Sequence, residues 1–177
     1  DGTVMAWGYN GYGQLGNGTL EDQVTPVAVS GLSDVEAIAA GKYHSLALQS
    51  DGTVWAWGED ADGQLGDGEP TNDGGQVYPI NTINLSNVEA IAAGQYHSMA
   101  LLGDGTVYTW GNSEYGQLGW SDPSNGWEYT PNLVPVISDI IAISAGGWHS
   151  MALQSDGTVW AWGLGNDGQL GDGTNTE

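Results

Sequence analysis

The chain has 177 residues, and its 22 Asp and Glu side chains face a single Lys, Lys42, so its formal net charge at pH 7 is −21. Phosphate groups would repel such a surface, which excludes nucleic acid as a partner and an anionic membrane as a docking surface. The sequence has no Cys, which excludes disulfides, and no run of 18 apolar residues that would indicate membrane insertion. With 9 Trp and 8 Tyr there is enough apolar surface for a folded core, so the acidity does not indicate disorder.

The first recognisable element is the phrase Asp-Gly-Thr-Val-x-x-Trp-Gly, which starts at residues 1, 51, 104 and 156. A period near fifty residues indicates a repeated supersecondary unit, and most often a β-propeller. We therefore interpret residues 1–177 as one propeller segment with repeats 1–50, 51–103 and 104–155 and a partial repeat 156–177. The chain starts on a turn and stops in a loop, so we expect it to be a window on a longer protein.

Strands are predicted in chain order at 35–39, 44–48, 53–57 and 77–80, the last as an edge strand. The Asp51-Gly52 pair between the second and third strands is a hairpin signal. Four short antiparallel strands per repeat make a propeller blade, so the predicted fold is all-β. Both faces of each blade are apolar, and the open ends of an arc should need further blades, a protein partner or self-association.

Two more elements recur with the first phrase. Gly-Gln-Leu-Gly occupies 13–16, 63–66, 116–119 and 168–171, and Ala-Gly-x-x-His-Ser-x-Ala-Leu occupies 40–48, 93–101 and 145–153. Together they resemble the repeats of the regulator-of-chromosome-condensation family over essentially the whole chain. The resemblance implies a ring of about seven blades, of which this chain supplies about half. It looks more like the secreted bacterial members of the family than like the eukaryotic nuclear exchange factor, so we expect an extracellular or cell-surface location in a salt-adapted microbe.

The histidines are the most obvious reactive groups, and His44, His97 and His149 share one repeat position. Equivalent positions in successive blades lie too far apart for one metal ion, so hydrogen-bonded structural roles are favoured. Each His precedes a Ser, but adjacent strand residues point to opposite faces and cannot form a couple within one strand. The Gln of each Gly-Gln-Leu-Gly loop is expected to pair with open backbone groups.

The residues just before each His are Tyr43, Tyr96 and Trp148. They follow an Ala-Gly break, so we expect one large aromatic side chain per blade on the same rim. One interpretation is a partner-binding row, because exposed Tyr and Trp serve as interface anchors. The alternative is packing over the blade edge. The family resemblance favours the row, since it implies protein contacts through this loop.

The third repeat contains a distinctive loop with Trp120, Trp127 and Tyr129, punctuated by Pro and Gly. Aromatic side chains in such a loop could clamp a sugar or a peptide, and the alternative is a loop folded over the outer edge.

Asp60, Asp62 and Asp67 lie close together in the second repeat and are weak candidates for calcium ligands. No helix flanks them and no Glu closes the loop, and Asp is also a common turn former. We therefore assign no metal and no cofactor.

The sequence singles out no catalytic residue, because no paired carboxylates or nucleophile stand out among the repeats. We predict a non-enzymatic scaffold for protein interaction, which binds through aromatic loops on one face. The alternative function is a lectin-like carbohydrate binder or a calcium-assisted surface or adhesion module.

Overall fold

The protein, seen here in a computed structural model, is described over residues 2–69, 74–120 and 126–175. These ranges contain strands, turns and loops, and they hold no helix that could cross a membrane. The strands are β1 (Met5–Gly8), β2 (Gln23–Ala28), β3 (Val35–Ala40), β4 (His44–Gln49), β5 (Val54–Gly58), β6 (Gln76–Asn81), β7 (Val88–Ala93), β8 (His97–Leu102), β9 (Val107–Asn112), β10 (Trp127–Leu133), β11 (Ile140–Ala145), β12 (His149–Gln154) and β13 (Val159–Gly163).

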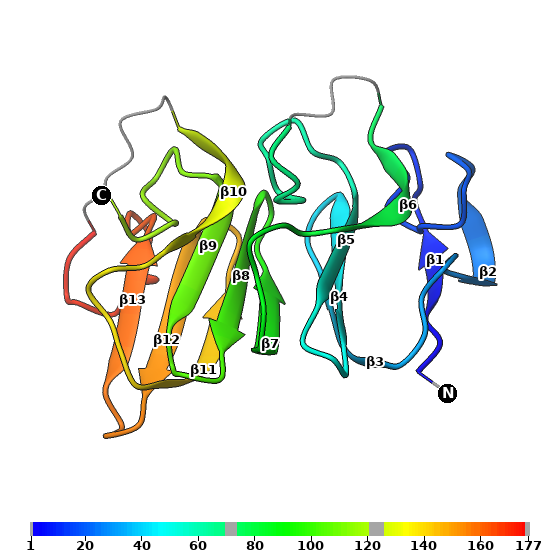
Figure 1. Ribbon diagram of the computed structural model, residues 1–177. Helices are drawn as coiled ribbons and strands as arrows, with labels where there is room; N and C mark the ends of the chain where they lie inside the picture. Colours follow the sequence, from blue (N-terminus) through cyan, green and yellow to red (C-terminus); the bar gives the residue numbers. More distant parts are fainter. Residues whose placement is uncertain (1, 70–73, 121–125, 176–177) are drawn as a thin grey trace.

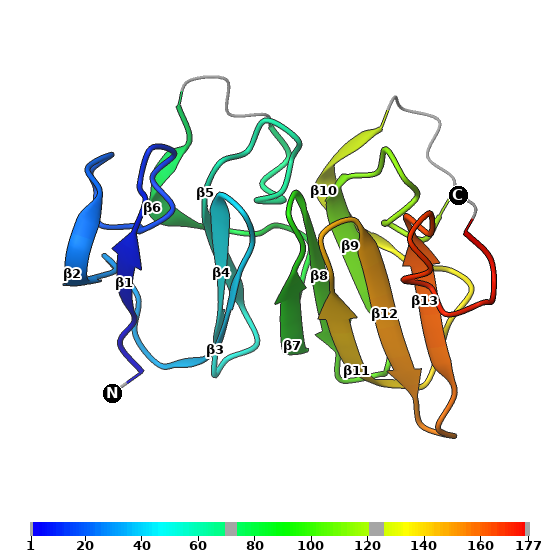
Figure 2. The same cartoon turned by 180° about the vertical axis from the view of Figure 1, so that it is seen from behind.

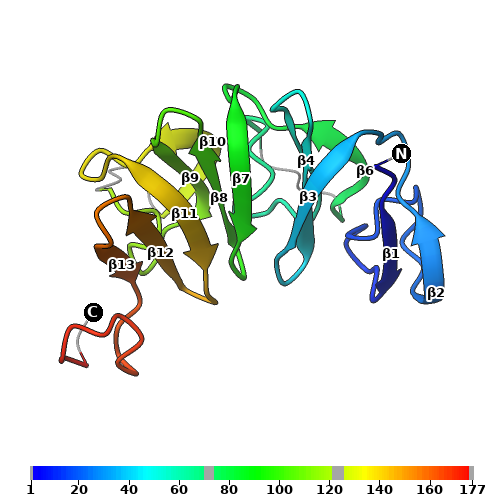
Figure 3. The same cartoon turned by 90° about the horizontal axis from the view of Figure 1, so that it is seen from below.

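The strands form separate antiparallel sheets that stand side by side along an open arc (Figures 1 and 3). Two sheets have four strands, in the orders β3-β4-β5-β6 and β7-β8-β9-β10. The arc begins with the pair β1-β2 and ends with the three strands β11-β12-β13. Strand β7 contacts both β3 and β11, and these three strands mark the inner side of the arc (Figure 2). The predicted all-β propeller architecture is confirmed.

The predicted strands agree with the structure to within about one residue at each end, and β6 is an edge strand as predicted. The hairpin between β4 and β5 turns at Gly52, whose φ of 80° is one that residues with a Cβ rarely adopt. The repeated phrase therefore begins at the third strand of a sheet. A sequence repeat thus spans two sheets, with its first half in one and its second half in the next.

The core lies between neighbouring sheets. Leu46 and Val54 project from one side of the β3–β6 sheet and form a buried cluster with Val88 and Trp110 of the next sheet. Met99 and its neighbours repeat this arrangement towards the β11–β13 sheet. Burying each Val, Leu or Met side chain stabilises the fold by about 1.5–3 kcal/mol. Stability therefore depends on stacking the sheets rather than on any single sheet.

The two ends of the arc show what an unstacked sheet exposes. Val159 is 58% exposed, whereas its equivalents Val54 and Val107 are 1% and 0% exposed between sheets. At the other end Ile38 is 64% exposed, while its equivalent Ile91 packs against the preceding sheet. The apolar end faces expected from the sequence are present. Self-association through them stays a prediction.

Candidate functional site

The three aromatic residues predicted to form a row lie together on one rim. Tyr43, Tyr96 and Trp148 each occupy the turn that leads into β4, β8 or β12, and all are half-buried. The ring centroids of Tyr43 and Tyr96 are 6.3 Å apart, and those of Tyr96 and Trp148 are 5.1 Å apart. These separations are typical of interacting aromatic pairs. The arc therefore converts one residue per sheet into a continuous aromatic surface.

The row is longer than the sequence analysis predicted. Tyr12 lies 4.8 Å from Tyr43, and Tyr115 lies 5.3 Å from Trp148, both measured between ring centroids. Tyr9 adds a further ring at 6.1 Å from Tyr43. Tyr12 and Tyr115 share the position just before the Gly-Gln-Leu-Gly loop, where the other repeats have Asp. The appearance of Tyr in place of Asp at this position is visible in the sequence, and it could have predicted that Tyr12 and Tyr115 belong to the row.

Backbone hydrogen bonds between neighbouring turns hold the row in place. The Lys42 amide donates to the Gln95 carbonyl at 3.3 Å, and the Gln95 amide donates to the Gly147 carbonyl at 3.1 Å. The Glu59 amide donates to the Tyr43 carbonyl at 2.9 Å. A surface ordered in this way loses little conformational entropy when a partner binds.

The ammonium group of Lys42 contacts two aromatic rings of the row. Its Nζ lies 5.0 Å from the centroid of the Tyr43 ring and 4.8 Å from that of Tyr96, and it donates to the Tyr96 hydroxyl at 2.6 Å. That hydrogen bond raises the pKa of Lys42. Faces of aromatic rings attract cations through their quadrupole. The only Lys in the chain therefore lies between two rings of the row.

Carboxylates lie beside the aromatic row. Burial, and then the charge of Asp62, raises the pKa of Glu59. Burial also raises the pKa of Asp62, and the carboxylate of Glu114 adds to the effect. The charge of Glu59 in turn raises the pKa of Tyr12. Partly desolvated carboxylates beside aromatic faces are an environment that favours a cationic group.

Behind the row, a repeated hydrogen-bond chain connects successive sheets. His44 Nε2 lies 3.0 Å from Ser98 Oγ of the next sheet, and Ser98 Oγ donates to the Gln64 carbonyl at 2.8 Å. The Trp110 indole donates to the same carbonyl at 2.9 Å. His97, Ser150 and Gln117 repeat the arrangement, with the His–Ser separation at 2.9 Å. We call this repeated set the His–Ser–Gln chain.

The tautomer of His44 follows from this chain. The one hydroxyl proton of Ser98 points to the Gln64 carbonyl, so His44 Nε2 carries the proton and donates to Ser98 Oγ. Within the described residues, Nδ1 of His44 and of His97 is buried without a hydrogen-bond partner. A Cβ on Gly41 would collide with the His44 ring, which explains the glycine there.

The prediction of hydrogen-bonded structural histidines is confirmed for His44 and His97. The Ser–His pairing itself was missed, because only pairs within one strand were considered. Ser98 and Ser150 are buried, so neither hydroxyl is presented to a substrate.

The predicted backbone pairing of the loop glutamines is confirmed. Gln64 Oε1 accepts a hydrogen bond from the Asp62 amide at 2.9 Å, and Gln117 Oε1 accepts one from the Tyr115 amide at 2.9 Å. The loop that orders the glutamine carbonyl for the His–Ser–Gln chain therefore also positions the residue that precedes it on the rim.

We expect Ser98→Ala to lower the free energy of unfolding by about 2–3 kcal/mol, because it leaves the buried His44 N–H without an acceptor. Ser45→Ala is the matched control. Ser45 donates to the Gln14 carbonyl at 2.9 Å but accepts no hydrogen bond from a His among the described residues. Ser45→Ala should therefore lower the free energy of unfolding by only about 1 kcal/mol. Urea unfolding of both variants measures the difference, and equal losses would contradict the assigned role of His44.

The structure does not bring the three aromatic residues of the third-repeat loop together. Trp120 packs against the core and donates to Thr109 Oγ1 at 3.1 Å, while Tyr129 lies against the Gly63 turn. Trp127 is 46% exposed on β10, and no ring contact joins the three among the described residues. Residues 121–125 of this loop lie outside the described residues.

Of the three Asp residues proposed as weak calcium candidates, Asp60 and Asp67 accept hydrogen bonds within their own turns. Asp60 is buried and its Oδ1 accepts the Leu65 amide at 2.9 Å, and Asp67 Oδ1 accepts the Glu69 amide at 3.2 Å. Asp62 Oδ2 accepts a hydrogen bond at 3.4 Å from the side-chain Nδ2 of Asn112. Within the described ranges, no three His, Cys, Asp or Glu side chains gather as a metal-ligand set.

Stacked antiparallel sheets on an arc, linked by one repeated hydrogen-bond chain, define a β-propeller protein. The chain belongs to the RCC1-like domain family, whose model matches residues 1–177. The family resemblance seen in the sequence is thus confirmed.

Among its relatives is protein pim1 of Schizosaccharomyces pombe, 32% identical over 196 residues that cover 99% of this chain and 36% of that protein. Ultraviolet-B receptor UVR8 of Arabidopsis thaliana is 34% identical over 183 residues, covering 100% of this chain and 40% of the receptor. The structure of yeast RCC1 (Prp20) bound to Kap60 matches with a TM-score of 0.84 at 27% identity, over 97% of this chain and 42% of that one. The structure of human WBSCR16 matches with a TM-score of 0.82 at 27% identity, over 94% of this chain and 44% of that one. The chain thus spans about two fifths of the length of these relatives.

Proposed function

We propose that this chain is a non-enzymatic scaffold that binds a basic protein through the aromatic row, which we define as Tyr9, Tyr12, Tyr43, Tyr96, Trp148 and Tyr115. The observation that carries the proposal is the continuity of the row across successive sheets. It combines large anchors with a preordered backbone, and such anchors dominate the energy of protein interfaces.

The basic character of the partner is supported by charge. The chain has a formal net charge of −21, and the carboxylate of Glu59 lies near Tyr12, with Asp62 close to Glu59. The position of Lys42 between Tyr43 and Tyr96 indicates how a Lys or Arg of a partner would be held. A similar protein, yeast RCC1 (Prp20), was solved bound to Kap60, and the structure of Prp20p from Saccharomyces cerevisiae was described together with its binding properties to Gsp1p and histones.

The test uses purified core histones as the basic probe at physiological salt. We expect the triple variant Tyr43→Ala, Tyr96→Ala and Trp148→Ala to lose binding, because each buried anchor contributes roughly 2 kcal/mol. The three substitutions leave the charge of −21 unchanged, so attraction by charge alone would survive them. Titration calorimetry of both proteins separates anchoring from general electrostatics.

Trp127→Ala is the matched control, because Trp127 is an exposed aromatic residue outside the row. It should bind the probe as the parent protein does. Urea unfolding must show that the triple variant is folded. A triple variant that unfolds would favour packing over the blade edge, and one that folds and binds normally would refute the row as the site.

A further inference from the structure

Lys42 lies in the middle of the aromatic row, between the two four-stranded sheets. Its Nζ is 5.0 Å from the ring centroid of Tyr43 and 4.8 Å from that of Tyr96, within the distance at which aromatic rings attract cations. It also donates to the Tyr96 hydroxyl at 2.6 Å. Tyr43 leads into β4 and Tyr96 leads into β8, and both sheets have four strands, so this contact does not depend on either end of the arc.

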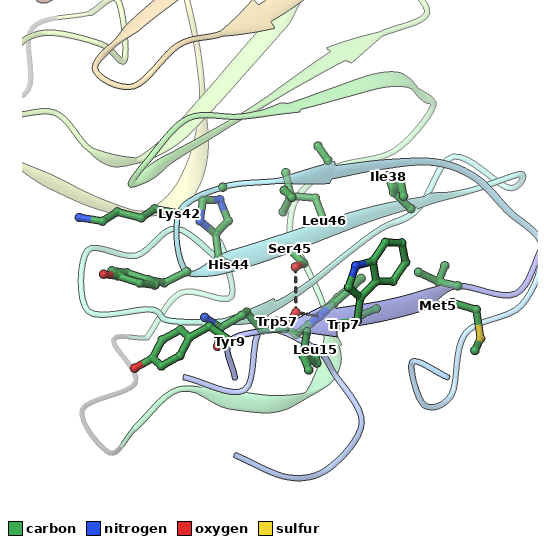
Figure 4. A pocket seen from close by; sticks show the side chains of 17 residues that line it. Met5, Trp7, Tyr9, Leu15, Ile38, Lys42, His44, Ser45, Leu46 and Trp57 are labelled. Atoms are coloured by element: carbon green, nitrogen blue, oxygen red, sulfur yellow. Dashed lines mark hydrogen bonds between the residues drawn. The ribbon is translucent and has the colours of Figure 1, made fainter. Parts of the chain in front are cut away.

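The backbone fixes the direction in which the Lys42 side chain leaves the turn. The Lys42 amide donates to the Gln95 carbonyl of the next sheet at 3.3 Å, which brings the side chain over the ring of the neighbouring turn. In Figure 4 the side chains of Lys42 and Tyr9 extend to the same side of the molecule, away from Leu46. The exposed ammonium group is therefore held on the face of the row that a partner would contact, and not in the core.

The equivalent positions in the next two repeats have no charge, because Gln95 and Gly147 occupy them. The Gln95 side chain lies against Gly147, so it also reaches the following turn. Lys42 is the only Lys or Arg in a chain with 22 carboxylates. The hydrogen bond with Tyr96, and to a smaller extent the charge of Glu59, raises the pKa of Lys42, so its ammonium group is protonated at neutral pH. The one fixed cation of the chain therefore lies where a partner's cation would bind.

We propose that Lys42 is an internal competitor of the basic partner, so that a partner's Lys or Arg binds between Tyr43 and Tyr96 only when Lys42 leaves these rings. The inference rests on the proposed function and adds how binding at the row is regulated. The apparent affinity of a site falls with the fraction of molecules in which that site is free. A side chain that occupies the rings in roughly nine molecules of ten weakens binding about tenfold.

The first test is titration calorimetry with purified core histones at physiological salt, on the parent protein and on Lys42→Gln. The chain itself has Gln at the equivalent position 95, so the turn should accept this substitution. We expect Lys42→Gln to bind histones about 3–10-fold more tightly, because no cation of the chain then occupies the rings. Lys42→Arg keeps a cation over the rings, and it should bind no more tightly than the parent protein.

Removal of a positive charge also strengthens the general attraction to a basic partner, so the control must match the charge. Val24→Glu does so, because Val24 is 98% exposed on β2 and lies outside the row. Val24→Glu and Lys42→Gln each make the net charge one unit more negative than the −21 of the parent protein. An equal gain in affinity in these two variants would overturn the inference, since charge alone would then account for it.

The second test observes Lys42 directly by NMR. Labelling the protein with ¹³C-lysine gives the signals of this one residue, because the chain has no other Lys. The ε-methylene protons should lie upfield of those of free lysine, since the adjacent Nζ lies over two rings, and saturating unlabelled histones should move them to the free-lysine position. Signals that start at the free-lysine position, or that stay in place while histones bind, would overturn the inference and leave the proposed function intact. Histones that bind neither the parent protein nor Lys42→Gln would refute the proposed function, and this inference with it.

Discussion

Lowering the pH from 7.5 to 5 is expected to remove roughly 4 kcal/mol from the free energy of unfolding, about 2 from each of His44 and His97. Burial lowers the pKa of His44 to about 4 and that of His97 to about 3, and charge on His44 and His149 lowers the latter further. Protonation would place an N–H on Nδ1, which has no hydrogen-bond partner among the described residues. Only the unfolded chain therefore takes up these protons as the pH falls.

The sign follows from the depressed pKa values. The contribution of each histidine is fully present above the unfolded pKa of about 6.5 and is lost as the pH falls towards the folded value. Glu59 and Asp62 have raised pKa values and act in the opposite direction, as does the relief of repulsion among the acids. The contribution of the histidines to the pH dependence is therefore measured as the difference between the parent protein and a variant that lacks them.

Urea unfolding in 1 M NaCl at pH 7.5 and 5 should be run on the parent and on the His44→Gln, His97→Gln variant. We expect the parent to lose roughly 4 kcal/mol more than the variant over this range. Equal pH dependence of the two proteins would show that the buried histidines are not the titrating groups.

The melting temperature is expected to rise by about 10 °C between 20 mM and 1 M NaCl, since screening of like charges should relieve a few kcal/mol of repulsion. The chain has 22 carboxylates against one Lys, so repulsion in the folded state exceeds that in the expanded chain. Such a dependence fits a salt-rich setting outside the cell, and that location stays a prediction.

The control is a variant with four exposed acids neutralised, Glu21→Gln, Glu36→Gln, Glu69→Gln and Glu89→Gln. It should melt higher than the parent at low salt and gain less from added NaCl. KCl should act as NaCl does. A flat or falling melting curve in both salts would contradict the electrostatic explanation.

The architecture was predictable because it depends on local signals that repeat. Asp51-Gly52 identifies a hairpin, and the residues around it alternate as strands, so β4 and β5 follow from a short window of sequence. The position of Tyr43, Tyr96 and Trp148 on one rim follows from their common place after a glycine. Their mutual contact was a consequence of the predicted stacking of blades.

The remaining features depend on which residues of different sheets meet. His44 and Ser98 are 54 positions apart in the sequence, and only the stacking geometry brings them within hydrogen-bond distance. The same holds for Lys42 and Tyr96. Alternation within a strand indicates which face a residue occupies, but it does not identify the residue that faces it from the next sheet.

The central claim is that the aromatic row binds a basic partner, and amide hydrogen exchange with and without bound core histones tests it most directly. The account predicts slower exchange at residues 41–43, 94–96 and 146–148, which carry the row between neighbouring sheets. It predicts unchanged exchange in the outer strands β6 and β10. Protection confined to those outer strands, with the three turns unaffected, would contradict it.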